Sequence, residues 1–255
     1  MHKILAIAVN TFRETVRDKI LYVLLAFAFL MIGSAAILIR ISVRAEGRII
    51  LDLGLTAISL VGVLMAVFVG ITLVYKELDR RTIFTILSKP IHRWQFIFGK
   101  YLGLLTTLAI NVAAMSLLLF ILHRILTGEW AWVLLPALLL TYMELTVVTG
   151  LAIFFSAFTT PVLSATFTLA LFLIGRLSGD LVAFLGRGES AAVRAAAVAL
   201  YYVLPNLRAF DIKAQVVMSR ALDPRWVAGA AAYGALYALF VLAATILIFQ
   251  GRDFK

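Results

Sequence analysis

The sequence has no cysteine, only 5 prolines and only 3 histidines among its 255 residues. Without cysteine, the chain can form no disulfide, no thiolate metal site and no cysteine nucleophile. The histidines at positions 2, 92 and 123 share no helical face, so we expect no metal site and no metal ligands. Charge is also scarce: 14% of the residues are charged, whereas soluble domains carry about 25%. This composition excludes an ordinary soluble fold.

Apolar residues dominate instead, at 64% of the chain with a mean hydropathy of +1.06. They occur in runs of about 20 residues, the length a helix needs to cross the hydrocarbon core of a bilayer. The sequence therefore predicts an all-α, polytopic integral membrane protein with one transmembrane domain over residues 1–255. The expected segments are an interfacial helix at 1–19, spans at about 20–39, 50–74, 99–122, 132–157, 162–185 and 226–249, a charged loop at 75–98, and an outer loop at 186–225.

Charge patterning predicts the topology and the lipid contacts. Residues 1–19 alternate apolar and polar positions at helical spacing, which is typical of a helix lying in the headgroup plane. A plain cytosolic extension of the first span is the alternative. Six spans place both termini on one side, and the densest Lys and Arg cluster near span ends lies at 75–103, which predicts cytoplasmic termini in the cytoplasmic membrane. Basic residues flank apolar spans, so the net charge of +10 indicates lipid headgroups and no nucleic acid.

The stretch 75–103 separates two long apolar runs and carries six basic residues. Asp79 is placed to cap a short helix from Arg80 to about Ser88, and Pro90 ends it because proline cannot continue a helix. This pattern predicts a surface helix across the inner mouth of the bundle, on which a cytoplasmic partner pushes. A solvated basic loop that only sets the topology is the alternative.

Three ionisable residues fall inside predicted spans, where they are costly and usually face the bundle interior. Glu144 and Arg176 each lie about 20 Å from the inner edge, counting about 1.5 Å per helical residue. Because their spans are antiparallel neighbours, we expect a Glu144–Arg176 pair near mid-membrane, with Asp180 as the rival partner of Arg176. The pair either rearranges when the bundle changes conformation, or lines a polar path through the bundle, or holds two helices together as a static contact.

No residue in the sequence indicates covalent chemistry. A phosphate-cradling loop needs Gly, four residues, Gly-Lys and then Ser or Thr. Gly99-Lys100 comes nearest, but position 94 is Trp and position 101 is Tyr. We therefore expect no catalytic residue and no enzyme activity in this chain.

The 75–103 stretch also carries a specific order of motifs. An acidic–basic cluster is followed by Arg-Thr-Ile, by Leu-Ser-Lys-Pro-Ile, by a basic and an aromatic stretch, and by Gly-Lys-Tyr-Leu-Gly. The residues of this pattern are Glu77, Arg81, Thr82, Ile83, Leu87, Ser88, Lys89, Pro90, Ile91, Arg93, Gly99 and Lys100. The pattern resembles the coupling segment of type-2 ABC transporter permeases, the ABC-2 class. The segment is also similar to that of permeases for nitrous-oxide-reductase maturation or copper processing.

The resemblance implies an ATP-driven exporter whose permease subunits pair as a homodimer on two copies of an ABC ATPase. ATP and Mg would bind to the ATPase, and this chain would bind no cofactor. The implied coupling residues are Glu77, Arg80, Arg81, Thr82, Ile83, Leu87, Lys89, Pro90 and Arg93.

Two other functions stay open at this point. One is a membrane scaffold through which an ATPase drives a mechanical change in an outer partner, favoured if 186–225 forms an exposed cap and disfavoured if it dips into the leaflet. The other is an ATP-independent secondary carrier, which predicts an inverted repeat and broken helices that the sequence does not display. The few polar groups in the spans favour an amphiphilic or lipid-like cargo.

Overall fold

A computed structural model describes residues 2–39, 46–79, 92–185, 204–218 and 222–250 of the chain. Every regular element among these residues is helical, which confirms the all-α class. The helices are α1 (His2–Val16), α2 (Lys19–Ile39), α3 (Glu46–Asp79), α5 (Arg93–Thr127), α6 (Leu134–Ser156), α7 (Pro161–Leu185), the 3-10 turn η1 (Leu207–Phe210), α9 (Lys213–Val217) and α10 (Pro224–Gln250).

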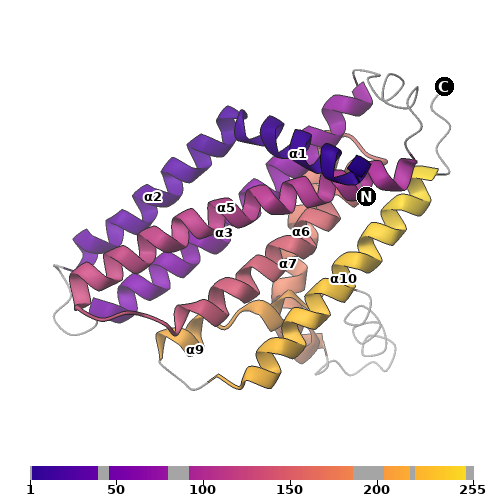
Figure 1. Ribbon diagram of the computed structural model, residues 1–255. Helices are drawn as coiled ribbons and strands as arrows, with labels where there is room; N and C mark the ends of the chain where they lie inside the picture. Colours follow the sequence, from indigo (N-terminus) through magenta and orange to yellow (C-terminus); the bar gives the residue numbers. More distant parts are fainter. Residues whose placement is uncertain (1, 40–45, 80–91, 186–203, 219–221, 251–255) are drawn as a thin grey trace.

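Six of these helices, α2, α3, α5, α6, α7 and α10, are long and apolar enough to cross a membrane. They run in alternating directions, so the bundle has two ends (Figure 1). We call the end with α1, the start of α5 and the end of α10 the terminal end, and the opposite end the distal end. Helices α3 and α5, with 34 and 35 residues, extend past the expected spans. At about 1.5 Å per residue they exceed the roughly 30 Å of hydrocarbon, so their ends reach into the headgroup layer.

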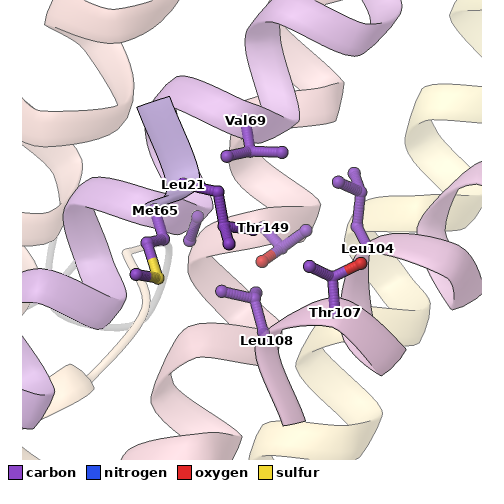
Figure 2. A pocket seen from close by; sticks show the side chains of 8 residues that line it. Leu21, Met65, Val69, Leu104, Thr107, Leu108 and Thr149 are labelled. Atoms are coloured by element: carbon purple, nitrogen blue, oxygen red, sulfur yellow. The ribbon is translucent and has the colours of Figure 1, made fainter. Parts of the chain in front are cut away.

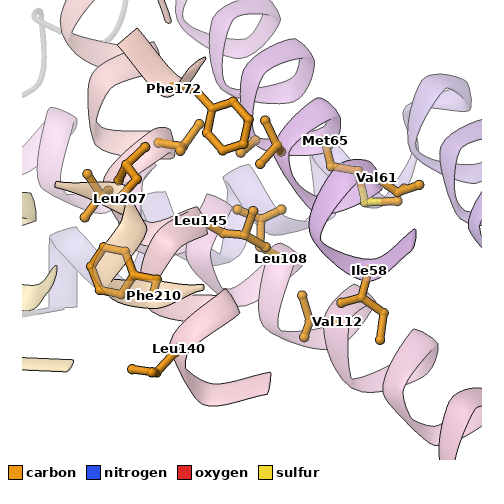
Figure 3. Close-up of a cluster of buried hydrophobic side chains, with 14 of the residues drawn as sticks. Ile58, Val61, Met65, Leu108, Val112, Leu140, Leu145, Phe172, Leu207 and Phe210 are labelled. Atoms are coloured by element: carbon orange, nitrogen blue, oxygen red, sulfur yellow. The ribbon is translucent and has the colours of Figure 1, made fainter. Parts of the chain in front are cut away.

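Helix α3 lies at the centre of the bundle and packs against α2, α5, α6 and α7. Figure 3 shows how its apolar side chains meet those of its neighbours, with Ile58 of α3 beside Val112 of α5. Leu145 of α6 is fully buried in the same cluster. The outer faces of the bundle carry exposed apolar residues such as Val162 and Leu236, which suits a surface in contact with lipid.

Helix α1 lies against the first turns of α5. Two glycines of α5 make this approach close: a Cβ atom at Gly99 would lie 2.8 Å from the Cβ of Ile7, and one at Gly103 would lie 2.6 Å from the backbone oxygen of Ala8. Small residues four apart are a common device for close helix packing in membranes. Helix α1 is thus docked on α5 through this glycine pair.

Residues 204–212 form an irregular segment that packs inside the distal half of the bundle. A Cβ at Gly175 of α7 would lie 2.6 Å from the backbone oxygen of Pro205, so only glycine permits this approach. Gly175 is ten residues before the end of α7, which corresponds to about 15 Å along the helix. Leu207 and Ile212 are buried. Irregular backbone at this depth is tolerated where protein surrounds it, as it does here.

A small apolar cavity lies between α2, α3, α5 and α6 (Figure 2). Met65 and Ala66 line it from α3, and Thr107 and Thr149 from α5 and α6. Both threonine hydroxyls donate to a backbone oxygen four residues earlier in their own helix, at 3.0 and 2.7 Å. The cavity therefore presents no free polar group to a ligand, and we interpret it as a packing defect.

Candidate functional site

The structure places Glu144 of α6 beside Arg176 of α7, with Glu144 Oε1 at 3.2 Å from Arg176 Nε. Glu144 is 1% exposed and Arg176 is 25% exposed. Ser59 of α3 donates a long hydrogen bond of 3.5 Å to the other oxygen of Glu144. The guanidinium also lies over the Phe172 ring, with its central carbon 5.5 Å from the ring centroid. The buried carboxylate is thus held between three helices.

Asp211 is the second partner of Arg176, at 3.2 Å between Asp211 Oδ2 and Arg176 Nη2. It follows the segment 204–210, in which Pro205, Leu207 and Phe210 are buried, and is itself 37% exposed. Arg176 therefore bridges two different carboxylates. Glu144 is buried on α6, whereas Asp211 is part-exposed and lies between η1 and α9. We call Glu144, Arg176 and Asp211 the ion triad.

The triad lies deep within the bundle. Glu144 is ten residues after the distal start of α6 and twelve before its end, so it sits near the middle of the helix. At about 1.5 Å per residue, its depth from the distal end of α6 is about 15 Å. An unpaired charge at this depth costs much free energy. The triad therefore stabilises the packing in which α6 holds Glu144 against Arg176 of α7.

Lys213 of α9 adds a fourth charge beside the triad. Its burial and then the nearby Arg176 guanidinium lower the pKa of the Lys213 amine, against the opposing effect of Asp211, Glu144 and Asp52. Charges of both signs therefore gather at the distal side of the triad. None of these groups is placed as an activated nucleophile, so the arrangement suits reversible ionic contacts and not covalent chemistry.

Sequence reasoning missed Asp211. It falls in the loop expected at 186–225, where an acidic residue is ordinary, and only the fold of 204–212 brings it to Arg176. Asp180, the expected rival, belongs to α7, but its side chain lies outside the described residues. The only sequence signal for Asp211 was an acidic residue directly after the apolar pair Ala209 and Phe210.

Most of the expected coupling residues lie outside the described residues: Arg80, Arg81, Thr82, Ile83, Leu87, Lys89 and Pro90. Glu77 belongs to the last turns of α3, and its side chain is likewise outside. Arg93 is described and begins α5. Its Nη1 donates a 2.9 Å hydrogen bond to the backbone oxygen of Phe249, in the last turn of α10.

Lys100 is a second terminal-end residue whose place the sequence did not indicate. It carries part of the family resemblance, yet it is 2% exposed, with its Nζ 3.7 Å from Glu14 Oε2 of α1. The same Nζ lies 5.8 Å from the centroid of the Phe96 ring. Burial beneath α1 makes Lys100 a residue that holds α1 to α5.

Comparison with known families supports these observations. The family model described as ABC-2 family transporter protein matches residues 5–253, nearly the whole chain. The chain belongs to the ABC-2 transporter family. No curated protein matches it.

As an ABC-2 permease, the chain is a multi-pass membrane protein and a transmembrane subunit. The matched residues hold no ATPase domain, and permeases of this family partner with an ABC ATPase. Among the described residues, no group of three or more His, Cys, Asp or Glu side chains is placed to hold a metal ion.

Proposed function

We propose that this permease is half of a homodimeric ATP-driven exporter in the cytoplasmic membrane, with two copies of a separate ABC ATPase on its terminal end. Its membership in the ABC-2 family carries this proposal. ATP and Mg bind to the ATPase, and this chain converts the closure of the ATPase pair into movement of its helices.

The loop at 75–98 is the proposed contact with the ATPase, which places both chain termini in the cytoplasm. Two observations support this assignment. The loop joins α3 to α5 at the terminal end, where α1 is docked on α5. Its basic residues form the densest positive cluster near the ends of the spans, as expected for a cytoplasmic side.

The test is affinity purification of the tagged permease in mild detergent, with mass spectrometry of the proteins that accompany it. We expect an ABC ATPase at equal stoichiometry, and we expect Arg81→Glu with Leu87→Glu to release it. The matched control is the double variant Arg48→Glu with Ile125→Glu. It also replaces one arginine and one aliphatic residue by glutamate, but at exposed positions of the distal end. Release by the first pair alone supports the proposal. A folded permease that retains no ATPase contradicts it.

Membership in the ABC-2 family does not identify the cargo. The mostly apolar interior of the spans favours an amphiphile. Apart from the triad and its neighbours, several buried hydroxyls of the spans, among them those of Thr107 and Thr149, donate to the backbone of their own helices. A bare ion would find few ligands along such a path. The likeness to permeases of nitrous-oxide-reductase maturation or copper processing concerns the coupling segment alone and stays a prediction.

A further inference from the structure

We propose that the Arg176–Asp211 ion pair is the distal gate of this permease, and that α10 is the element that transmits the motion of the coupling loop to it. The proposal rests on the proposed function for its energy source, because it assigns the ATPase to the terminal end. It adds Arg93 and Tyr233 as positioning residues for the transport cycle.

The triad is built so that one contact opens before the other. Glu144 is 1% exposed, and separating Arg176 from it would leave a buried carboxylate with a weak 3.5 Å bond from Ser59. Asp211 is 37% exposed, so water can solvate it when the pair separates. Arg176 therefore stays with Glu144 while Asp211 moves away.

Asp211 moves only if the segment that carries it moves. That segment packs against α7 and α6, and it also contacts α10, which is its link to the terminal end. The backbone N–H of Asn206 donates a 2.9 Å hydrogen bond to the Tyr233 hydroxyl. The Phe210 ring lies 6.1 Å from the Tyr233 ring, and a Cβ at Gly234 would lie 2.9 Å from the Phe210 ring edge. The segment thus packs on one turn of α10.

The other end of α10 is attached to the start of α5. Phe249 is one residue from the end of α10, where the helix presents backbone carbonyls to neighbouring groups. The Arg93 guanidinium supplies a partner at 2.9 Å, and its positive charge suits a helix C-terminus. The Phe96 and Phe249 rings stack alongside at 6.4 Å. Arg93 lies within the coupling loop at 75–98, where α5 begins, so a push on that loop reaches the end of α10.

The two attachments are sixteen residues apart on one helix, which corresponds to about 24 Å. Helix α10 runs without a break from Pro224 to Gln250, as Figure 1 shows. It has no proline after its first position, so it lacks the usual cause of a sharp kink. A displacement at Phe249 therefore reaches Tyr233 as movement of a rigid rod.

The absence of cysteine gives a direct test. A reporter variant, Ser59→Cys, places one thiol beside Glu144, beneath the gate. The permease–ATPase complex is reconstituted in lipid nanodiscs and treated with a cationic, water-soluble methanethiosulfonate reagent, and the rate of thiol modification is measured. Val148→Cys, one turn from Glu144 toward the terminal end and also buried, is the second reporter should the first fail to fold.

The first arm tests the gate and needs no nucleotide. We expect Asp211→Asn to raise the modification rate about two- to fivefold. Loss of a part-exposed ion pair shifts the equilibrium between the closed and the open gate by about this factor, and the modification rate follows that equilibrium. Glu129→Gln, the same kind of change at an exposed distal residue, should leave the rate unchanged. An unchanged rate in Asp211→Asn would overturn the gate.

The second arm tests transmission. In the reporter complex, trapping the ATPase with ATP and vanadate should change the modification rate. Arg93→Gln and Tyr233→Phe should each abolish that change while ATP hydrolysis continues, whereas Arg93→Lys and the exposed control Tyr22→Phe should retain it. A nucleotide response that survives in both Arg93→Gln and Tyr233→Phe would overturn the role of α10. Failure of the proposed function has a different signature: no ATPase then joins the permease, while the first arm, which needs no nucleotide, still reads the gate in nanodiscs that hold the permease alone.

Discussion

Replacing Glu144 by alanine should destabilise the permease far more than replacing Asp211 by alanine. Both carboxylates lie 3.2 Å from Arg176, so distance alone would rank them equal. Their exposures differ, at 1% for Glu144 and 37% for Asp211. The difference in burial therefore determines which of the two variants loses more stability.

The magnitudes follow from the two environments. Removing one partner of a buried ion pair typically costs about 3–5 kcal/mol, because the other charge is left uncompensated. Arg176 keeps Asp211 and is 25% exposed, which places Glu144→Ala at the lower end of that range. Loss of a part-exposed pair costs about 0–1 kcal/mol, which applies to Asp211→Ala. The expected difference between the two variants is about 2 kcal/mol or more.

Reversible unfolding in mixed micelles of dodecyl sulfate and a mild detergent, followed by circular dichroism, measures both free energies. Leu236→Ala, on an exposed apolar face, is the control for a change that only removes lipid contact. The double variant Glu144→Leu with Arg176→Met should recover most of the lost stability, since apolar replacement of a whole buried pair is often neutral. Equal effects of Glu144→Ala and Asp211→Ala would refute the argument from burial.

Three further outcomes are expected. Gly103→Leu should detach α1 from α5, because its Cβ would meet the backbone oxygen of Ala8 at 2.6 Å, and faster hydrogen exchange in α1 alone would report it. Ala66→Val should raise the free energy of unfolding by up to about 1 kcal/mol, since its methyl groups enter the apolar cavity, and a lower value would indicate overpacking. The pKa of Lys213 is lowered in the folded state, so the unfolded chain binds more protons and stability should rise with pH up to the ordinary lysine pKa of 10.5. Lys213→Met should remove that slope in unfolding titrations at several pH values.

Hydropathy alone was sufficient to predict the six membrane helices, because each crossing of a bilayer needs about 20 apolar residues. The extra length of α3 and α5 was not predicted, since hydropathy marks where the apolar run stops and a helix can continue as a polar extension. Hydropathy also gives no sign of which neighbours a small residue approaches: Gly234 of α10 meets Phe210 and Met143 of the same chain.

The contacts that build the candidate site were harder to predict because they join distant parts of the chain. Arg93 and Phe249 are 156 positions apart, and a backbone carbonyl leaves no trace in the sequence. Lys100 reads as one more basic residue of a charged stretch, yet α1 covers it. Hydropathy and charge describe one residue at a time, whereas these contacts depend on which helix lies alongside.

The ion triad also bears on the kind of cargo. Its three members sum to one negative charge, and Lys213 and Asp52 nearby add one charge of each sign. In the proposed transport cycle, a cargo with a large permanent charge would have to pass these charges at a depth where desolvation is costly. The proposed amphiphile would meet a lower barrier, because its apolar part would stay with the exposed apolar faces of α7 and α10 while its polar head contacts Arg176 and Asp211. The charges at this depth therefore agree with the mostly apolar cargo that we propose.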